Sequence, residues 1–342
     1  MYKLTANLAQ MIVNKMMKDI PYNINIMDKN GVIIGSGNKE RIGILHHGAV
    51  DAIRYRKAVE IKKDEEFVKK GINLPIEMNG DIIGVVGISG EIGETRPFGN
   101  LVRSTVILLI EQSVALEKAN QEEKRKYDLF NRIMDTDTLY TKELAEQAKV
   151  YGLELNKPSQ IVYVESQSNI DEINLNDLPT FKITNDSICI VVQEIELVDP
   201  LITRIQKQNQ DVRISISGVN DRPSNGYIQA KSAMRVLRGL FSDKKIIFYT
   251  DCEVIADISE WLKQNRSIEK ITTLLEKNEE LCKTLQVYLN SNLNSNEAAG
   301  LLNIHRNTLN YRLEKIQKIT GKDPKNILEL VELLFILINR IK

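Results

Sequence analysis

Apolar positions recur at helical spacing over residues 4–17, and the period then shortens to that of strands. Two β-rich runs, 25–28 and 32–34, flank Asn30-Gly31, and two more, 73–78 and 82–89, flank Asn79-Gly80. Short apolar runs joined through Asn-Gly predict β-hairpins, because both residues tolerate the positive φ of a tight turn. Helical patterns over 40–58 and 64–70 lie between the hairpins. This part of the chain therefore predicts a small α+β domain.

A long helix is predicted to follow this domain. It opens at Thr95-Arg96-Pro97, with Thr95 as its cap, and its apolar positions continue as far as Leu116. The pattern then runs into the charged stretch 117–126. Such a helix is typical of a connector between domains or of a dimerising segment.

Strands and helices alternate in the middle of the chain. Runs rich in β-branched residues cover 161–165, 188–193, 212–217 and 245–249. Helical patterns over 197–208 and 226–240 separate the later strands. Alternation of this kind predicts a layered α/β domain.

The last seventy residues contain only helical patterns. One helix includes Leu281 to Leu289, and Ser295 is the predicted cap of a short helix over 296–302. A break at 303–305 leads into a helix over 306–320, which Gly321 ends. Asp323-Pro324 is predicted to cap and start the final helix. The apolar stripe expected for that helix comprises Leu328, Val331, Leu334, Phe335 and Ile338.

Composition narrows the class of protein. The 342 residues carry 46 Lys and Arg against 46 Asp and Glu, and 42 % hydrophobic residues argue against global disorder. The three cysteines, Cys189, Cys252 and Cys282, lie far apart in apolar contexts, which predicts buried, reduced thiols and no zinc site. We expect no metal and no cofactor. Without a signal-peptide core or a membrane-length apolar run, we expect a cytoplasmic protein with no membrane partner.

The charge is unevenly distributed. Residues 282–342 hold nine Lys and Arg against five Asp and Glu, a formal charge of +4, so the remainder carries −4. Within 303–325 there are six basic and two acidic residues. The neutral total therefore leaves room for a basic, DNA-binding C-terminal segment.

The helix over 306–320 has the surface of a DNA-recognition helix. At about 100° per residue, Leu309, Leu313 and Ile316 form one buried stripe, while Asn307 and Tyr311 point away from it. Asn reads adenine edges, and Lys and Arg contact phosphates. A short helix and a tight break before it match a helix-turn-helix; an ordinary helical bundle with a solvated polar face is the alternative. The predicted DNA-binding residues are His305, Arg306, Asn307, Thr308, Asn310, Tyr311 and Arg312.

These residues also carry a resemblance. The run from Ile304 to Leu313 (IHRNTLNYRL), followed by Ile319-Thr320-Gly321, resembles the C-terminal helix-turn-helix of PucR-type regulators. The other end resembles the sugar-diacid-recognition domain, at residues 8–10, 25–28, 31–34, 41–43, 46, 48–49, 73–76 and 83–88. Both ends occur in the order found in the carbohydrate diacid regulator family. The resemblance of the middle domain to that family's degenerate GGDEF-like domain depends mainly on element order.

The resemblance implies an α+β multidomain protein with three parts. These are a PAS/Cache-like α+β sensor domain with the connector helix (residues 1–130), a degenerate GGDEF-like α/β domain (131–262) and an all-α helix-turn-helix domain (263–342). It also implies a regulator that binds operator DNA and responds to a small hydroxy-carboxylate, such as a sugar diacid, glycerate or glycolate. We expect a homodimer or higher homo-oligomer, because one short helix buries too little surface for tight specific binding.

A hydroxy-carboxylate needs a cation or oriented N–H groups for its carboxylate and polar groups for its hydroxyls. Arg41 offers a bidentate partner, and amides near an expected helix start at Ile42 and Gly43 add an anion-binding dipole. His46 and Ser36 add hydrogen-bonding groups. The predicted effector-binding residues are Ser36, Arg41, Ile42, Gly43, His46, Leu74 and Pro75.

Two other functions are alternatives. A diguanylate cyclase needs a glycine-rich phosphate turn and metal-binding acids, and the hairpin expected near Thr184–Ser187 contains no GGDEF-like run. With no Walker loop, nucleophile elbow or zinc signature elsewhere, we expect no enzyme activity. The second alternative is a carboxylate-sensing signalling adaptor whose C-terminal helices bind a protein. Strong salt dependence of DNA binding would separate it from a regulator.

Overall fold

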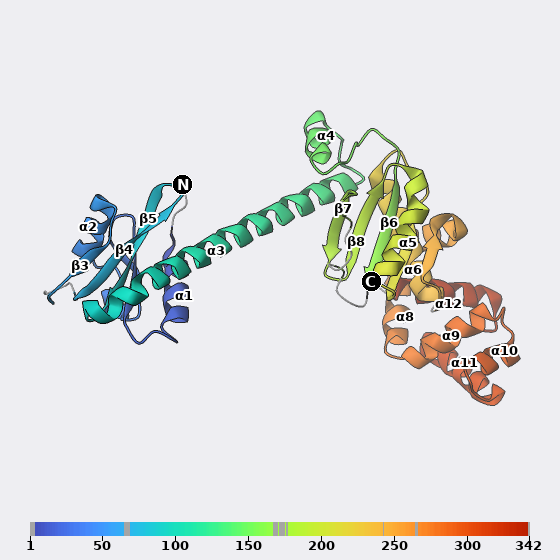
Figure 1. Ribbon diagram of the computed structural model, residues 1–342. Coiled ribbons are helices and arrows are strands. Elements are labelled where there is room, and N and C mark those ends of the chain that lie inside the picture. Colours follow the sequence, from blue (N-terminus) through green and yellow to red (C-terminus); the bar gives the residue numbers. More distant parts are fainter. Residues whose placement is uncertain are drawn as a thin grey trace. The chain divides into compact units, whose positions relative to one another are not determined.

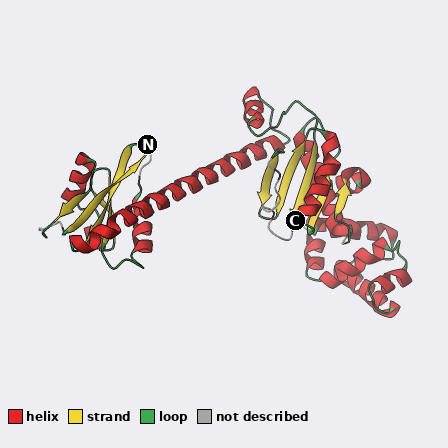
Figure 2. Cartoon of the chain, viewed as in Figure 1, coloured by secondary structure: helices red, strands yellow, loops and turns green. Residues whose placement is uncertain are grey.

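The computed structural model describes residues 4–64, 69–166, 170, 175, 177–241, 243–263 and 266–340, without the side chains of 266–269. The chain divides into two compact units, residues 1–123 and 124–342 (Figure 1). Each unit contains one β-sheet flanked by helices (Figure 2). The predicted helix over 64–70 falls mostly outside the described residues. No described helix is both long enough and apolar enough to cross a membrane.

The sheet of the first unit contains both predicted hairpins. Its strands are β1 (Ile24–Asp28), β2 (Ile33–Ser36), β3 (Val59–Ile61), β4 (Gly71–Met78) and β5 (Asp81–Ser89), in the antiparallel order β2-β1-β5-β4-β3. Asn79 and Gly80 have φ of 52° and 85° between β4 and β5. A turn with two positive φ angles matches the right-handed twist of its strands.

Helices cover both faces of this sheet. On one face, α1 (Ala6–Met16) and the first turns of α3 (Ile92–Met134) pack on the side chains of Ile24, Ile26 and Val86. On the other face, α2 (His47–Tyr55) packs through Ala49 and Ala52. The alternation of side chains along each strand produces these two apolar layers.

Two helices predicted in the first unit are present with different bounds. The helix expected over 40–58 is a single 3-10 turn, η1 (Lys39–Arg41), followed by the short α2. The long helix begins at Ile92, so Thr95 lies inside it, and its Oγ1 donates to the carbonyl oxygen of Glu91 at 3.0 Å. Pro97 is accommodated near the start of that helix, where backbone N–H groups have little intrahelical bonding to lose.

The second unit contains the predicted α/β layer. Its sheet comprises β6 (Gln160–Ser166), β7 (Thr180–Thr184), β8 (Ser187–Val192), β9 (Val212–Ile216) and β10 (Ile246–Phe248), in the order β10-β9-β6-β8-β7 with only β9 and β10 parallel. α5 (Val198–Gln208), after the 3-10 turn η3 (Ile195–Leu197), covers one face. α6 (Pro223–Leu240) covers the other. The four predicted strands and the two predicted helices are confirmed, and β7 completes the hairpin at Thr184–Ser187.

The remaining elements lie before and after the sheet in the chain. α4 (Lys142–Lys149) precedes the sheet, and η4 (Tyr249–Asp251) leads into α7 (Glu253–Leu262). The C-terminal helices are α8 (Arg266–Glu276), α9 (Glu279–Asn290), α10 (Ser295–Leu301), α11 (Arg306–Thr320) and α12 (Ile327–Asn339). They share one hydrophobic core with α6. The division at residue 262, and the PAS/Cache-like and GGDEF-like descriptions, stay predictions. All three cysteines are buried and unbridged, as predicted.

Two helix starts in this region differ from the predictions. Asn294, one residue before Ser295, caps α10, and Asn326 caps α12 in place of Asp323-Pro324. The expected stripe on α12 was correct at Phe335 and Ile338, which are buried. It was wrong at the start of the helix, where Leu328 is 76 % exposed while Leu330 and Leu333 are buried. The helix is apolar almost all round, so periodicity alone did not identify its inner face.

Candidate functional site

A row of polar residues crosses the sheet of the first unit on the face that α2 covers. Asn25 on β1 pairs with Ser36 on β2 and with Gly87 on β5, and Gly87 pairs with Asn73 on β4. Ser36 Oγ donates to Asn25 Oδ1 at 2.7 Å. The side chains of Asn25, Ser36 and Asn73 are almost fully buried. Because Gly87 has no side chain, the Asn73 carboxamide lies close over it: a Cβ on Gly87 would be 2.8 Å from Asn73 Oδ1.

The N-terminal end of α2 lies beside this row. A Cβ placed on Gly48 would be 2.7 Å from Asn73 Nδ2 and 3.3 Å from His46 Cε1. Gly48 therefore lets the imidazole and the amide approach the same point on the helix. His46 occupies the cap position of α2, and its backbone N–H donates to the carbonyl oxygen of Gly31 at 2.9 Å.

His46 is only 4 % exposed, and its Nδ1 has no hydrogen-bond partner within the described part of the chain. Burial is the main cause that lowers the pKa of His46 to about 4, and Arg41 and His47 add to it through their charges. The imidazole is therefore neutral at neutral pH. A buried polar atom without a partner is costly, so Nδ1 favours a ligand that can hydrogen-bond to it.

The structure brings together three of the predicted effector residues. Arg41 ends the 3-10 turn η1, is partly buried, and lies close enough to His46 to influence its charge. Ser36 lies in the polar row. A neutral imidazole, two carboxamides, a hydroxyl and a guanidinium on one side of the sheet are suited to a small ligand with a carboxylate and hydroxyls.

Ile42 and Gly43 do not provide the expected helix start. The N–H of Ile42 donates to the carbonyl oxygen of Lys39 at 3.2 Å, and the N–H of Gly43 donates to that of Ile33 at 2.8 Å. Both amides are therefore used within the protein. Gly43 has a φ of 89°, and no atom lies within 4 Å of the position that a Cβ would occupy there, so its surroundings are open.

Leu74 and Pro75 lie on opposite faces of β4. The side chain of Leu74 belongs to the core beneath α1 and α3, away from His46. Pro75 pairs with Val85 and alternates with Leu74, so it lies on the same face as Asn73. The expectation that both side chains close one pocket is corrected by this alternation.

Asn25, Asn73 and Gly87 are candidate site residues that sequence reasoning missed. Their signal is the interruption of apolar strands by a short polar residue or a glycine, as in INIMD and GINLPIEM. An isolated strand cannot show that these interruptions align, since pairing register depends on all four strands.

In the second unit, α10 and α11 form the predicted helix-turn-helix. Leu309, Leu313 and Ile316 of α11 are fully buried, as expected. The opposite side is exposed, and Tyr311 is 63 % accessible. His305, Arg306, Asn307 and Thr308 are exposed at the start of the helix, and Asn310 is half-buried. His305 caps the helix, its Nδ1 accepting the N–H of Asn307 at 3.3 Å.

Arg312 has a different position from the one predicted. Its guanidinium forms an ion pair with Glu280 on α9 and donates to Thr284 Oγ1 at 3.3 Å. The side chain therefore fastens α11 to α9 instead of extending into solvent. The predicted residues that stay exposed within α11 are Arg306, Asn307, Thr308 and Tyr311.

Comparisons with known proteins match the two ends of the chain to two domain families. Residues 4–133 match the family of sugar diacid recognition domains, and residues 281–338 match the PucR C-terminal helix-turn-helix domain. A protein of Haemophilus influenzae without an assigned function is 32 % identical over 92 % of this chain and 93 % of its own. The proline-responsive transcriptional activator PutR of Bacillus subtilis is 25 % identical over 60 % of this chain and 59 % of its own.

A further relative matches nearly the whole chain. The carbohydrate diacid regulator of Escherichia coli strain K12 is 30 % identical over 95 % of this chain and 95 % of its own. Its match includes both the unit with the polar row and the unit with the exposed face of α11. The protein described here belongs to the carbohydrate diacid regulator family.

Proposed function

We propose that this protein is a transcriptional regulator whose first unit binds a small hydroxy-carboxylate and whose α11 binds operator DNA. The main observation in support of ligand binding is the polar row Ser36-Asn25-Gly87-Asn73, which lies beside His46 and Arg41. Family membership supports the same function, since the relatives' names include a carbohydrate diacid regulator and a transcriptional activator. We propose a cytoplasmic location for the same reason.

In this proposal Arg41 binds the ligand carboxylate. The asparagine carboxamides and the Ser36 hydroxyl bind its hydroxyl groups, and neutral His46 contributes one further hydrogen bond. A sugar diacid, glycerate or glycolate carries groups of both kinds. Binding would change the relative populations of protomer arrangements and thereby the affinity for paired DNA half-sites.

A thermal-shift screen of glycolate, glycerate, glucarate and galactarate tests the effector. We expect at least one to raise the Tm of the wild-type protein, because a ligand that binds only the folded state stabilises it. Arg41→Ala should abolish that rise, and Arg54→Ala, which removes an exposed arginine of α2, should keep it. A full ligand response in the Arg41 variant would place the carboxylate elsewhere.

DNA binding is tested on α11. The double variant Asn307→Ala with Tyr311→Ala should lose specific operator shifts, because these two side chains lie on the exposed face. Gln317→Ala, an exposed change later on the same helix, is the matched control. Normal specific binding by the double variant would contradict the assignment of α11 as the recognition helix. Weak salt dependence would favour the signalling adaptor instead.

We also propose that the protein acts as a homodimer. Ile327, Leu328 and Val331 form an exposed apolar patch at the start of α12, which supports contact with a second protein chain. Sedimentation of wild-type protein and of Leu328→Lys at equal concentration tests this. A wild-type protein that stays monomeric at micromolar concentration would contradict the dimer.

A further inference from the structure

A cavity of about 1130 Å³ lies within the second unit, and none of its lining residues belongs to either proposed site. Its lining comes from β6, the β7–β8 hairpin, the starts of β9 and β10, one face of α6, and from α7, α8 and the end of α12. It is large enough for a ligand of nucleotide size, since ligand sites commonly have about 300–1,000 Å³. The cavity adjoins both the sheet layer and the C-terminal helices.

The lining is rich in cations. Seven lining residues are Lys or Arg and four are Asp or Glu, so positive charge exceeds negative charge by three. Lys231, Arg235 and Arg238 are spaced four and three residues apart on α6, which places them on one face of that helix. Arg213 lies on β9, and Lys245, whose Nζ is 3.7 Å from a carboxylate oxygen of Asp211, directly precedes β10. Cations therefore line the cavity from two separate directions.

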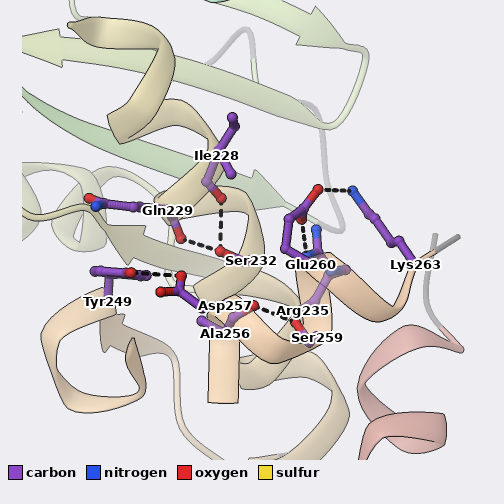
Figure 3. Close-up of polar contacts among 10 residues, drawn as sticks. All are labelled: Ile228, Gln229, Ser232, Arg235, Tyr249, Ala256, Asp257, Ser259, Glu260 and Lys263. Carbon is purple, nitrogen blue, oxygen red and sulfur yellow. Dashed lines mark hydrogen bonds and ion pairs between the residues drawn. The ribbon is translucent and has the colours of Figure 1, made fainter. Parts of the chain in front are cut away.

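Some of these charges are balanced within the protein. Arg235 pairs with Glu260, which also binds Lys263 Nζ at 3.1 Å (Figure 3). Arg238 Nη1 lies 3.2 Å from a carboxylate oxygen of Glu165. One acid is thus shared by two cations, so this part of the lining keeps a net positive charge.

Lys231 is less compensated than its neighbours on α6. Among the described residues, no carboxylate oxygen lies within 4.0 Å of its Nζ, which instead lies 5.3 Å from the centroid of the Tyr227 ring. Burial is the main cause that lowers the pKa of Lys231; Lys263 and Arg235 add to the shift, and the charges of Glu260 and Glu165 oppose it. An anion bound in the cavity would raise the pKa of Lys231, which is the opposite of the effect of the neighbouring cations.

Buried polar atoms in the lining also lack partners. Arg235 is 6 % exposed, yet its Nε forms no hydrogen bond within the described part of the chain. The same holds for both polar atoms of the Asn339 side chain at the end of α12. Arg235 and Asn339 therefore offer a donor on α6 and a donor and an acceptor on α12.

We propose that this cavity binds a small molecule with several phosphate groups, of the size of a nucleotide. Phosphate groups match the lining better than a single carboxylate, because each spreads its charge over several oxygens and the cations are distributed over two walls. A bound oligophosphate would contact α6 and the C-terminal helices together. It would thereby stabilise their junction and act as a second input, independent of the ligand of the first unit.

Three hydrogen bonds from side chains of α9 already join it to the end of α6. Gln286 on α9 donates to the carbonyl oxygens of Arg238 at 3.1 Å and Gly239 at 2.6 Å, and Asn290 donates to that of Leu240 at 2.7 Å. The last turn of α6 is therefore held by the helix that precedes the helix-turn-helix. A ligand bound to Arg238 and Lys231 on the same helix is coupled to that connection.

Calorimetric titration of the full chain with tripolyphosphate tests the proposal. We expect binding to wild-type protein, and binding about tenfold weaker or more in Lys231→Gln and in Lys263→Gln, from the loss of one charge-assisted contact each. Lys207→Gln, an exposed lysine of α5, is the matched control and should bind as wild type. Circular dichroism verifies that each variant is folded.

Three further probes identify the ligand's chemistry. GTP or ATP binding tighter than tripolyphosphate would show that a base adds contacts, and equal affinity would show that the phosphate chain suffices; both support the proposal. Citrate binding as tightly as tripolyphosphate would overturn the preference for phosphate. No tripolyphosphate binding by wild-type protein, or equal binding by the Lys231 and Lys263 variants, would overturn the site.

Discussion

Gly239 on α6 and Ile338 on α12 approach so closely that a Cβ on Gly239 would lie 2.7 Å from the Cα of Ile338. The carbonyl oxygen of Leu337 would be 2.9 Å away. Both neighbours are backbone atoms, which cannot move aside as the end of a flexible side chain can. The close contact between α6 and α12 is therefore possible only because residue 239 has no side chain.

Gly239→Ala should lower the free energy of unfolding by about 1–3 kcal/mol, because overpacking forces the two helices apart. Gly300→Ala is the matched control, since Gly300 lies in α10 with no atom within 4 Å of its Cβ position. That change should raise stability by about 0.5–1 kcal/mol through helix propensity. Urea unfolding followed by circular dichroism measures both, and a Gly239 variant as stable as wild type would contradict the tight contact.

The stability of the first unit should depend on pH through His46. The pKa of His46 is lowered from 6.5 to about 4 on folding, so between these values the unfolded chain binds a proton that the folded chain does not. The free energy of unfolding should therefore fall by roughly 3 kcal/mol as pH drops from above 6.5 to about 4. Chemical unfolding of wild-type protein at several pH values measures this.

His46→Gln should flatten that pH dependence, because a carboxamide does not titrate. His47→Gln, a change at an exposed neighbour, should keep most of it. An equally steep fall in the His46 variant would assign the dependence to another group.

Gly87→Ala should push the Asn73 carboxamide out of its place in the polar row. The new Cβ would lie 2.8 Å from Asn73 Oδ1, the end of a side chain that can turn, so we expect a folded protein. The ligand-induced rise in Tm should be lost, since the displaced carboxamide is one of the groups proposed to bind the ligand. Gly93→Ala, in open surroundings on α3, should retain the rise. A full response in the Gly87 variant would move the ligand away from the row.

Arg306 and Arg312 should differ in their effect on DNA binding. Arg306 is exposed, so Arg306→Ala should reduce the slope of log K against log salt by about one unit. Arg312 is paired with Glu280, so Arg312→Ala should mainly lower the stability of the C-terminal helices, by roughly 1 kcal/mol. Binding titrations at several salt concentrations measure the slopes, and equal slope changes would show that Arg312 also reaches a phosphate.

Most elements could be predicted from local patterns. The two Asn-Gly turns, the alternating strands of the central layer and the buried stripe of α11 each depend on residues close in sequence. Helix starts were less predictable. Thr95, Ser295 and Asp323 are all good capping residues, but another start lay within a few residues of each, and packing selected it.

The candidate ligand site was only partly predictable. Arg41, His46 and Ser36 lie close in sequence and carry suitable chemistry, so the sequence and its family resemblance were enough to propose them. Asn25, Asn73 and Gly87 come from three strands, and only strand register aligns them. Leu74 was misplaced because a one-residue step along a strand moves a side chain to the other face.

By itself the sequence determined the order of the elements, the basic character of the C-terminal segment and the exposed residues of α11, because these follow from spacing along one chain. Only the tertiary structure decided that Arg312 binds Glu280, that Leu328 faces outward, and that cations from α6, from β9 and from the loop before β10 line one cavity. Each of these depends on distances between segments that are remote in sequence. Such distances result from the packing of whole layers, which no local pattern encodes.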